Sequence, residues 1–385
     1  MAARLEFRGV CKAFPGAIAA DHVDVVIQRG TIHAIVGENG AGKTTLMRIA
    51  YGMVAPDAGQ LLIDGQPVAL GSPRAAMDAG IGMVHQHFMQ VGNFTAVENV
   101  VLGSEPRRGL LIDWEVARKQ LAALAHQTGM EVHVDAIVDD LDVGQRQQLE
   151  VLSALFRGAD TLILDEPTAV LAPHEASALF DVMRRMRDTG STLVLITHKL
   201  DEVLAVADVV TVMRSGRVVA THDLRTTQVT QEQLALDIVG ELLSTPQATV
   251  ASIGTEPILT VHNLTVTAEG RAVVDDVSLT LHRGEVLGIA GVAGNGQAEL
   301  AEAVVGLRSA VGQVLLNGVD LSTLSVRDRR DAGLAYIPED RYAQALLLDM
   351  PLWENRILGQ QGHAPASRYG FLTPRTARTD TQQII

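Results

Sequence analysis

The sequence has little of four things: cysteine, aromatic side chains, positive charge and long apolar runs. Cys11 is the one cysteine among 385 residues, so neither an intramolecular disulfide nor a four-cysteine zinc site can form, and we expect a reducing compartment. Aromatic residues make up 3% of the chain, and its formal net charge is −14. Because nucleic-acid binding needs stacking aromatic side chains and clustered Lys and Arg, we expect no nucleic-acid partner.

The sequence also shows no signal peptide and no membrane-spanning segment. The first ten residues, MAARLEFRGV, lack the apolar core of a signal peptide. No stretch of about 18 residues is both apolar and uncharged, so we expect no segment that spans a bilayer. The remaining composition, 47% hydrophobic and 20% charged, is typical of a globular protein long enough for two domains.

An internal repeat runs through the chain at an offset of 254 residues. Residues 21–68 align with residues 275–321. Each copy shows alternating apolar residues, an Arg-Gly turn, a short buried strand, a glycine loop, a helix and a second hairpin-like stretch. This order predicts an α/β fold, a mixed sheet with helices packed on it and a part of antiparallel strands.

The repeat also predicts the domain organisation. We expect a first domain at residues 1–240, a linker of small residues without Lys or Arg at 241–256, and a second domain at 257–385. The second copy is expected to be incomplete, because the offset places the counterpart of Gly144 at position 398, beyond Ile385.

The sequence GENGAGKT at residues 37–44 fits the phosphate-binding pattern G-x-x-x-x-G-K-[ST]. It follows an apolar run and precedes a helix-like segment, which is the context that the pattern requires. Glycines let backbone N–H groups converge on a phosphate at a helix N-terminus. In that arrangement Lys43 reaches the β- and γ-phosphates of ATP and Thr44 holds Mg²⁺. The alternative interpretation is a plain glycine turn.

Two further apolar strands end in residues with reactive side chains. TLILDEP places Asp165 and Glu166 at a strand end, where the first suits Mg²⁺ coordination and the second suits a base that polarises water. STLVLITH ends in His198 in the same way. Taken singly, an acidic turn after a buried strand and a structural histidine explain these residues equally well.

Taken together and in this order, these residues resemble the nucleotide-binding subunits of ABC transporters. The resemblance covers essentially the whole chain and assigns each motif in turn: Walker A at 37–45, the Q-loop at Gln86, the signature at 141–145, Walker B at 161–166 and the switch histidine at His198.

The resemblance implies a role for each residue of one ATP site. Phe14 would stack on adenine, and Gln86 would link Mg²⁺ and the γ-phosphate to the membrane subunit. Glu166, His198 and Gln86 are the expected catalytic residues, and Thr44, Gln86 and Asp165 the expected Mg²⁺ ligands. A mostly helical subdomain is expected at about residues 87–140. The expected nucleotide-binding residues are Phe14, Gly37, Asn39, Gly40, Gly42, Lys43, Thr44 and Thr45.

The sequence departs from the family pattern at two motifs. The signature has Asp142 where the family usually has serine, and its carboxylate is expected to cap the helix N–H groups that a phosphate needs. The second Walker A has Gln297, Ala298 and Glu299 in place of the lysine and two threonines. In a head-to-tail pair both departures fall in one composite site, which predicts one working site and one site that at most holds nucleotide. Random drift in a dispensable copy is the alternative.

The resemblance implies an ATP-hydrolysing subunit of an importer for a sugar or nucleoside-like solute. Phrases such as VHQHFMQVGNF and YIPEDR favour the nucleoside type. Permease subunits and, indirectly, an extracytoplasmic solute-binding protein are the implied partners, with the chain peripheral on the cytoplasmic face of the membrane. We expect slow turnover for the chain as given. Two alternatives are a fragment that only binds nucleotide and a soluble tandem ABC ATPase that acts on ribosomes or DNA.

Overall fold

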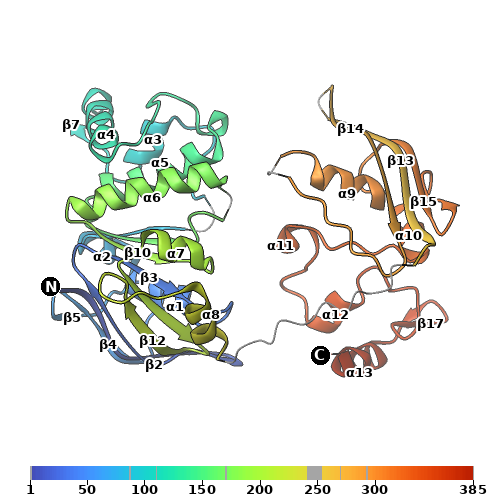
Figure 1. The fold of residues 1–385 in the computed structure, drawn as a ribbon, viewed down its shortest axis with the longest axis horizontal. Helices are drawn as coiled ribbons and strands as arrows, with labels where there is room; N and C mark the ends of the chain where they lie inside the picture. The colour runs from blue at the N-terminus through green and yellow to red at the C-terminus, as the bar shows by residue number, and fades with distance from the viewer. Residues whose placement is uncertain are drawn as a thin grey trace. The chain divides into compact units, whose positions relative to one another are not determined.

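The chain divides into two compact units, Met1–Thr245 and Pro246–Ile385 (Figure 1). Most of the predicted linker, residues 241–253, lies outside the part of the chain that is described. The computed structural model describes residues 2–85, 88–109, 111–169, 171–240, 254–268, 270–291 and 294–384.

The first unit is built on a six-stranded mixed sheet in the order β12-β11-β3-β10-β9-β6. Strand β12 is antiparallel to β11, and the other neighbouring pairs are parallel. The strands are β3 (Ile32–Val36), β6 (Ile81–Val84), β9 (Thr161–Asp165), β10 (Thr192–Ile196), β11 (Val209–Arg214) and β12 (Arg217–Asp223).

The central strands are buried on both faces, as continuous apolar runs predict. Along β9, Leu162 and Leu164 belong to one hydrophobic cluster and Ile163 to another. Successive side chains on a strand point to opposite faces, so the sheet separates two cores. One core packs against helices α3 to α6, and the other against α1 and a second, antiparallel sheet.

That second sheet has the strand order β2-β1-β4-β5. It begins with a long hairpin and brings its apolar residues, among them Leu5, Phe7 and Ile27, into the core beside α1. Its strands are β1 (Ala3–Phe14), β2 (Ala17–Gln28), β4 (Ala58–Ile63) and β5 (Gln66–Val68).

Helices α3, α4 and α5 gather at the end of the first unit opposite the antiparallel sheet (Figure 1). A capping box at Thr95 begins α3, and the carboxylate of Asp113 caps α4. The helices and short elements are α1 (Lys43–Ala50), α2 (Pro73–Asp78), α3 (Ala96–Val101), β7 (Arg107–Arg108), β8 (Leu111–Ile112), α4 (Trp114–Thr128), a 3₁₀ turn (Val138–Asp140), α5 (Val143–Phe156), α6 (Pro173–Asp188), α7 (Leu200–Val206) and α8 (Gln231–Val239).

The second unit repeats the antiparallel part of the first. Its four-stranded sheet has the order β14-β13-β15-β16, and helix α9 packs on it. The two units even share an irregularity of strand pairing. The register shift between Phe7 and Val10 on β1 recurs between Val261 and Leu264 on β13, 254 residues later. The elements are β13 (Pro257–Ala268), β14 (Arg271–His282), α9 (Gln297–Val305), β15 (Val311–Leu316) and β16 (Val319–Asp320).

One expectation for the second unit is wrong. The predicted buried strand at residues 285–290 does not form, and the side chains of Val286 and Ile289 are 96% and 56% exposed. Its counterpart β3 is held between β10 and β11. Within the described part of the second unit, no strand corresponds to β10 or β11, so residues 285–290 have no neighbouring strand with which to form backbone hydrogen bonds.

The rest of the second unit is a set of short elements around a small core of Ile357, Ala366 and Ala377. None of the helices described in either unit combines the length and the apolar composition that a membrane crossing needs. These last elements are α10 (Val326–Asp331), α11 (Arg341–Gln344), α12 (Leu352–Arg356), β17 (Ser367–Arg368), β18 (Phe371–Leu372) and α13 (Pro374–Ile384).

His33, the second residue of β3, is buried. One ring nitrogen, Nε2, bonds Thr211 Oγ1 on β11 at 2.8 Å, and Nδ1 has no partner among the described residues. Burial lowers the pKa of His33 from its ordinary value of 6.5 to about 4. The folded chain therefore keeps this ring neutral at pH values where the unfolded chain protonates it.

We expect His33 to make the first unit less stable as the pH falls from 6.5 towards 4, by about 3 kcal/mol at the lower end. His33→Leu, which copies Leu287 of the second unit, should flatten that part of the pH profile. Urea unfolding followed by the fluorescence of Trp114, in a Trp353→Phe background, measures this unit alone. An unchanged slope in the leucine variant would contradict the assignment.

Candidate nucleotide-binding site

The glycine loop that follows β3 has a backbone that only glycine fits. Gly40 and Gly42 have φ values of 83° and 98°, in the left-handed region. A Cβ on Gly42 would lie 1.9 Å from the carbonyl oxygen of Ala19, and one on Gly37 would lie 2.1 Å from that of Met213. The loop is thus held against β2 and β11 by contacts that exclude a side chain.

Helix α1 starts at the end of this loop, with Gly42 as its N-cap and without a side-chain cap. Its first N–H groups therefore face an open position where an anion is favoured. Asn39 is exposed on the loop, and Thr44 and Thr45 occupy the first turn of α1. The predicted loop residues thus surround one helix N-terminus.

Lys43 is 6% exposed and turns back over the loop. Its Nζ donates hydrogen bonds to the carbonyl oxygens of Gly37 (2.8 Å) and Glu38 (2.9 Å). Burial lowers the pKa of Lys43, and the nearby carboxylates of Glu166 and Asp165 oppose that shift. The loop thus holds a poorly hydrated cation at the place where phosphate oxygens would bind.

Sheet pairing brings the predicted acidic residues to this loop. β10 lies between β3 and β9, so the carboxyl ends of these parallel strands are adjacent. Asp165 ends β9, and its Oδ1 accepts a 3.4 Å hydrogen bond from the Thr44 hydroxyl. Burial first, and then the charge of Glu166, raise the pKa of Asp165. A bound cation would relieve both effects.

Glu166 and His198 meet beside Asp165. His198 Nδ1 lies 3.1 Å from Glu166 Oε1, and the backbone N–H of Glu166 donates to Ile196 O of β10 at 2.9 Å. Glu166 has a φ of 49°, which is unusual for a non-glycine residue and turns its side chain out of the strand direction. These contacts place a carboxylate and an imidazole next to the glycine loop.

Two residues of the predicted ATP site remain, Phe14 and Gln86, and the structure describes only the first of them. Phe14 ends β1, its side chain is 44% exposed, and the Lys12 ammonium lies 5.6 Å from its ring centre. The ring is therefore accessible for stacking. Gln86 lies outside the described residues, so its assignment stays a prediction.

One buried carboxylate was not identified from the sequence. Glu202, on α7, accepts hydrogen bonds from the hydroxyls of Thr168 (2.7 Å) and Thr197 (3.2 Å), and Lys199 Nζ lies 3.1 Å from it. Thr168 lies two residues after Glu166 in the segment that follows β9, and Thr197 and Lys199 flank His198 in the segment that follows β10. Glu202 therefore ties together the two loops that hold Glu166 and His198. Its only sequence signal is an acidic residue on the buried face of a short helix.

The signature segment has the predicted acidic cap. Asp142 Oδ1 accepts a hydrogen bond from the N–H of Gln145 at 2.7 Å, and the Gln145 side chain accepts one from the N–H of Asp142. A second carboxylate lies beside it, because a Cβ built on Gly144 would be 2.7 Å from Glu175 Oε1. The start of α5 is thus capped and flanked by negative groups, which disfavours a phosphate there.

Two glycines of the second glycine loop keep the conformations of their counterparts Gly40 and Gly42. Gly294 and Gly296 have φ values of 87° and 92°, and a Cβ on Gly296 would lie 2.4 Å from the carbonyl oxygen of Val273, the counterpart of Ala19. The chemistry differs, since α9 begins with Gln297, which lies against Gly291 as Lys43 lies against Gly37. Ala298 and Glu299 follow it, and Ala268 stands in place of Phe14.

Comparison with known proteins identifies the family. The ABC transporter family matches residues 20–169 and 274–383, and the two matches begin 254 residues apart, the offset of the internal repeat. The chain belongs to the ABC transporter family. This confirms the family and the duplicated α/β fold predicted from the motifs, and with them ATP binding and ATP hydrolysis as the biochemical class of the chain.

Among similar ABC proteins is the guanosine import ATP-binding protein NupO of Bacillus subtilis, which is 42% identical over 96% of this chain and 72% of its own length. The nucleoside import ATP-binding protein NupA of Lactococcus lactis is 40% identical, with 98% and 74% covered. The glucose import ATP-binding protein TsgD13 of Haloferax volcanii is 43% identical, with 91% and 69% covered.

Solved structures show the same ABC fold. A nucleotide-free ATP-binding cassette from an ABC transporter aligns with a TM-score of 0.54 and 22% identity, over 62% of this chain and 96% of that one. The protein cbiO1 of Clostridium perfringens aligns with a TM-score of 0.52 and 28% identity, over 58% and 89%.

The cap at Asp142 can be tested separately from its charge. Asp142→Ala should lower the free energy of unfolding of the first unit by about 1 kcal/mol, because an N–H group of α5 loses its acceptor. Asp142→Ser should leave stability nearly unchanged, because serine also caps. Urea unfolding monitored at Trp114 distinguishes them. Equal losses in both variants would show that the carboxylate does more than cap the helix.

Proposed function

We propose that the chain is the ATP-hydrolysing subunit of an ABC importer and that its working site lies in the first unit. The observation that supports this most is the convergence of Lys43, Thr44, Asp165, Glu166 and His198 at the adjacent ends of three parallel strands. These side chains are the types that phosphoryl transfer to water requires: a cation for the phosphates, oxygen ligands for a metal and a base.

The donor set beside the loop fits Mg²⁺. The Thr44 hydroxyl and the Asp165 carboxylate are hard oxygen ligands that already share a hydrogen bond, and the burial and Glu166 charge that raise the pKa of Asp165 favour neutralisation by a cation there. Thr44, Asp165 and the predicted Gln86 would hold the ion. When bound, Mg²⁺ supplies charge neutralisation at the phosphate oxygens.

In the proposed reaction the chain acts mainly by positioning. Lys43 exchanges its two loop carbonyls for phosphate oxygens, while the N–H groups of the loop and of α1 bind the same phosphates. Glu166 orients the attacking water and accepts its proton. His198, 3.1 Å from Glu166, fixes the direction of that carboxylate, and Phe14 stacks on the base.

The second glycine loop is proposed to have lost catalysis. Gln297 carries no charge, and Ala298 offers no hydroxyl to a metal. Together with the acidic start of α5 at Asp142, these changes leave a site that at most retains nucleotide.

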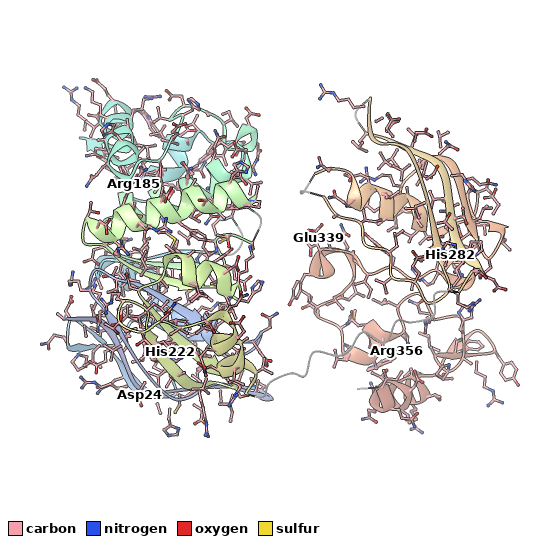
Figure 2. The ribbon with its side chains drawn as sticks, viewed as in Figure 1. Asp24, Arg185, His222, His282, Glu339 and Arg356 are labelled. Carbon is pink, nitrogen blue, oxygen red and sulfur yellow. The ribbon has the colours of Figure 1, made fainter. Side chains whose placement is uncertain are left out.

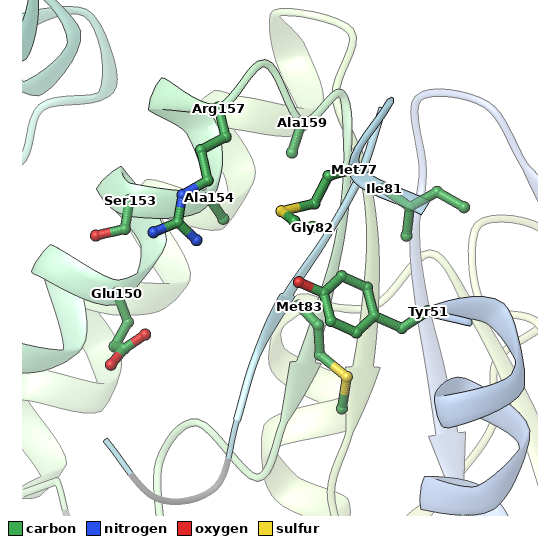
Figure 3. Close-up of a pocket in the computed structure, with 10 residues that line it drawn as sticks. All are labelled: Tyr51, Met77, Ile81, Gly82, Met83, Glu150, Ser153, Ala154, Arg157 and Ala159. Atoms are coloured by element: carbon green, nitrogen blue, oxygen red, sulfur yellow. The ribbon is translucent and has the colours of Figure 1, made fainter. Parts of the chain in front are cut away.

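A hollow between α5 and β6 supports docking of a permease to the first unit (Figure 3). Figure 3 shows Glu150 on α5 and Arg157, the C-cap residue of that helix, facing Tyr51 and Met83 across this hollow. Glu150 also accepts a hydrogen bond from the N–H of Met89, close to the predicted Q-loop. A partner bound here would contact the segment that leads to Gln86. We propose that membrane permease subunits bind here, with the chain peripheral on the cytoplasmic face.

The solute is proposed to be nucleoside-like. Two of the similar proteins are named for guanosine and nucleoside import, and they share 42% and 40% identity with the chain. A glucose import protein is equally similar, so a sugar is the second candidate. An extracytoplasmic protein would deliver the solute to the permease, and no nucleic acid is involved.

Glu166→Gln tests the catalytic assignment. We expect Mg-ATP to bind with unchanged affinity and hydrolysis to fall by at least about 100-fold, because only proton acceptance from water is removed. Single-turnover hydrolysis with the protein in excess, beside equilibrium binding, measures both. Glu299→Gln makes the same chemical change in the second loop and should leave the rate unaltered. Equal loss in the two variants would place catalysis elsewhere.

A further inference from the structure

A cluster of three metal-ligand side chains lies on the first hairpin. Cys11 on β1 and the neighbouring pair Asp21 and His22 on β2 each place one ligand atom within 4.8 Å of the others. His22 Nδ1 lies 2.6 Å from Asp21 Oδ1, and the N–H of His22 donates to Cys11 Sγ at 3.3 Å. The nucleotide mechanism uses none of these groups.

The second unit shows what the fold itself requires at these positions. The counterparts of the three residues are Thr265, Asp275 and Asp276. Thr265 Oγ1 accepts a hydrogen bond from the N–H of Asp276 at 3.0 Å, which reproduces the contact between Cys11 and His22. His22 and Asp276 also share left-handed φ values of 50° and 51°. The same hairpin therefore forms without a thiol or an imidazole, so folding does not explain these two groups.

The chemistry of the three groups matches one class of ligand. Thiolate, imidazole and carboxylate together suit a thiophilic divalent cation of borderline softness, and hard cations such as Mg²⁺ bind thiolate poorly. Ligand atoms around a tetrahedral Zn²⁺ are about 3.2–3.8 Å apart. The three ligand atoms lie within 4.8 Å of one another, so binding requires shifts of at most about 1 Å, and His22 Nδ1, now 2.6 Å from Asp21 Oδ1, has to move away from it by about 0.6 Å or more. The His22 side chain is 82% exposed and can make that movement.

The surroundings keep Asp21 in a suitable orientation. Arg217 holds the other carboxylate oxygen, Oδ2, at 2.6 Å and 2.8 Å, so Oδ1 stays directed at the cluster. The backbone N–H of Asp21 also donates to Gly216 O at 2.8 Å. These contacts hold one ligand in place before a cation arrives, which lowers the cost of ordering the site.

We propose that Cys11, Asp21 and His22 bind one Zn²⁺-like divalent cation, with a fourth coordination position left to solvent or to another ligand. Binding releases the thiol proton of Cys11, because the thiolate is the metal ligand. The thiol then no longer donates to Gly9 O, a contact of 3.6 Å that is weak in any case. The site is independent of the proposed ATPase function, and it lies on the strand that ends in Phe14.

Cobalt(II) titration of the whole chain under a phosphine reductant tests the proposal. Cys11 is the one cysteine in the sequence, so a sulfur-to-cobalt charge-transfer absorption in the near ultraviolet reports this site and no other. We expect the absorption to saturate at one Co²⁺ per chain and to vanish when Zn²⁺ is added. Weak Co²⁺ binding to other histidines does not produce this signal.

The second unit supplies the matched variants. Cys11→Thr should abolish the absorption, and His22→Asp should weaken Co²⁺ binding at least about tenfold. Both substitutions reproduce residues that the same hairpin already holds, so Mg-ATP binding and circular dichroism should match the unmodified chain. Absence of the absorption in the unmodified chain overturns the proposal, whether or not the variants fold. Wild-type affinity in a folded His22→Asp chain overturns it as well, because the thiol alone would then explain the signal.

Discussion

The pairing of β3 between β10 and β11 is the constraint on which the nucleotide site depends. It places the glycine loop after β3 next to the ends of β9 and β10, so that Lys43, Asp165 and His198 meet although they are far apart in the sequence. The second unit shows the consequence when this pairing is missing. Its corresponding segment, residues 285–290, forms no strand in the structure and leaves Val286 exposed.

The two glycine loops share backbone features but differ in the side chains that follow them. Gly42 and Gly296 keep the same left-handed conformation and the same close approach to a neighbouring carbonyl, which preserves the loop and the start of the helix. Lys43 and Thr44, the groups proposed to bind phosphate and metal in the first loop, are replaced by Gln297 and Ala298 in the second copy. A turn fixed by packing can therefore persist after its chemistry has changed. Figure 2 shows a further departure at Glu339, which corresponds to Gln86 and lies near α11.

Much of this architecture follows from the sequence alone. The apolar runs around Ile35, Ile163 and Val194 predict buried parallel strands, and the glycine pattern predicts the loop, because period and turn chemistry are local properties. The cap at Asp142 was also predictable, since a carboxylate before a helix seeks its N–H groups. Three features were not: the Glu202 contacts, the Glu175 carboxylate beside Gly144 and the failure of residues 285–290 to form a strand. Each depends on which distant segment becomes the neighbour.

We propose that the chain holds a single Mg-ATP site, although Gly294 and Gly296 of the second glycine loop share the left-handed conformations of Gly40 and Gly42. Equilibrium binding of Mg-ATP to the whole chain, to Lys43→Ala and to Gln297→Ala tests it most directly. We expect one bound nucleotide for the unmodified chain and for Gln297→Ala, and a large loss of affinity for Lys43→Ala, because Lys43 offers a positive charge to the phosphates and Gln297 does not. Two bound nucleotides of similar affinity, or equal losses from the two substitutions, would contradict it.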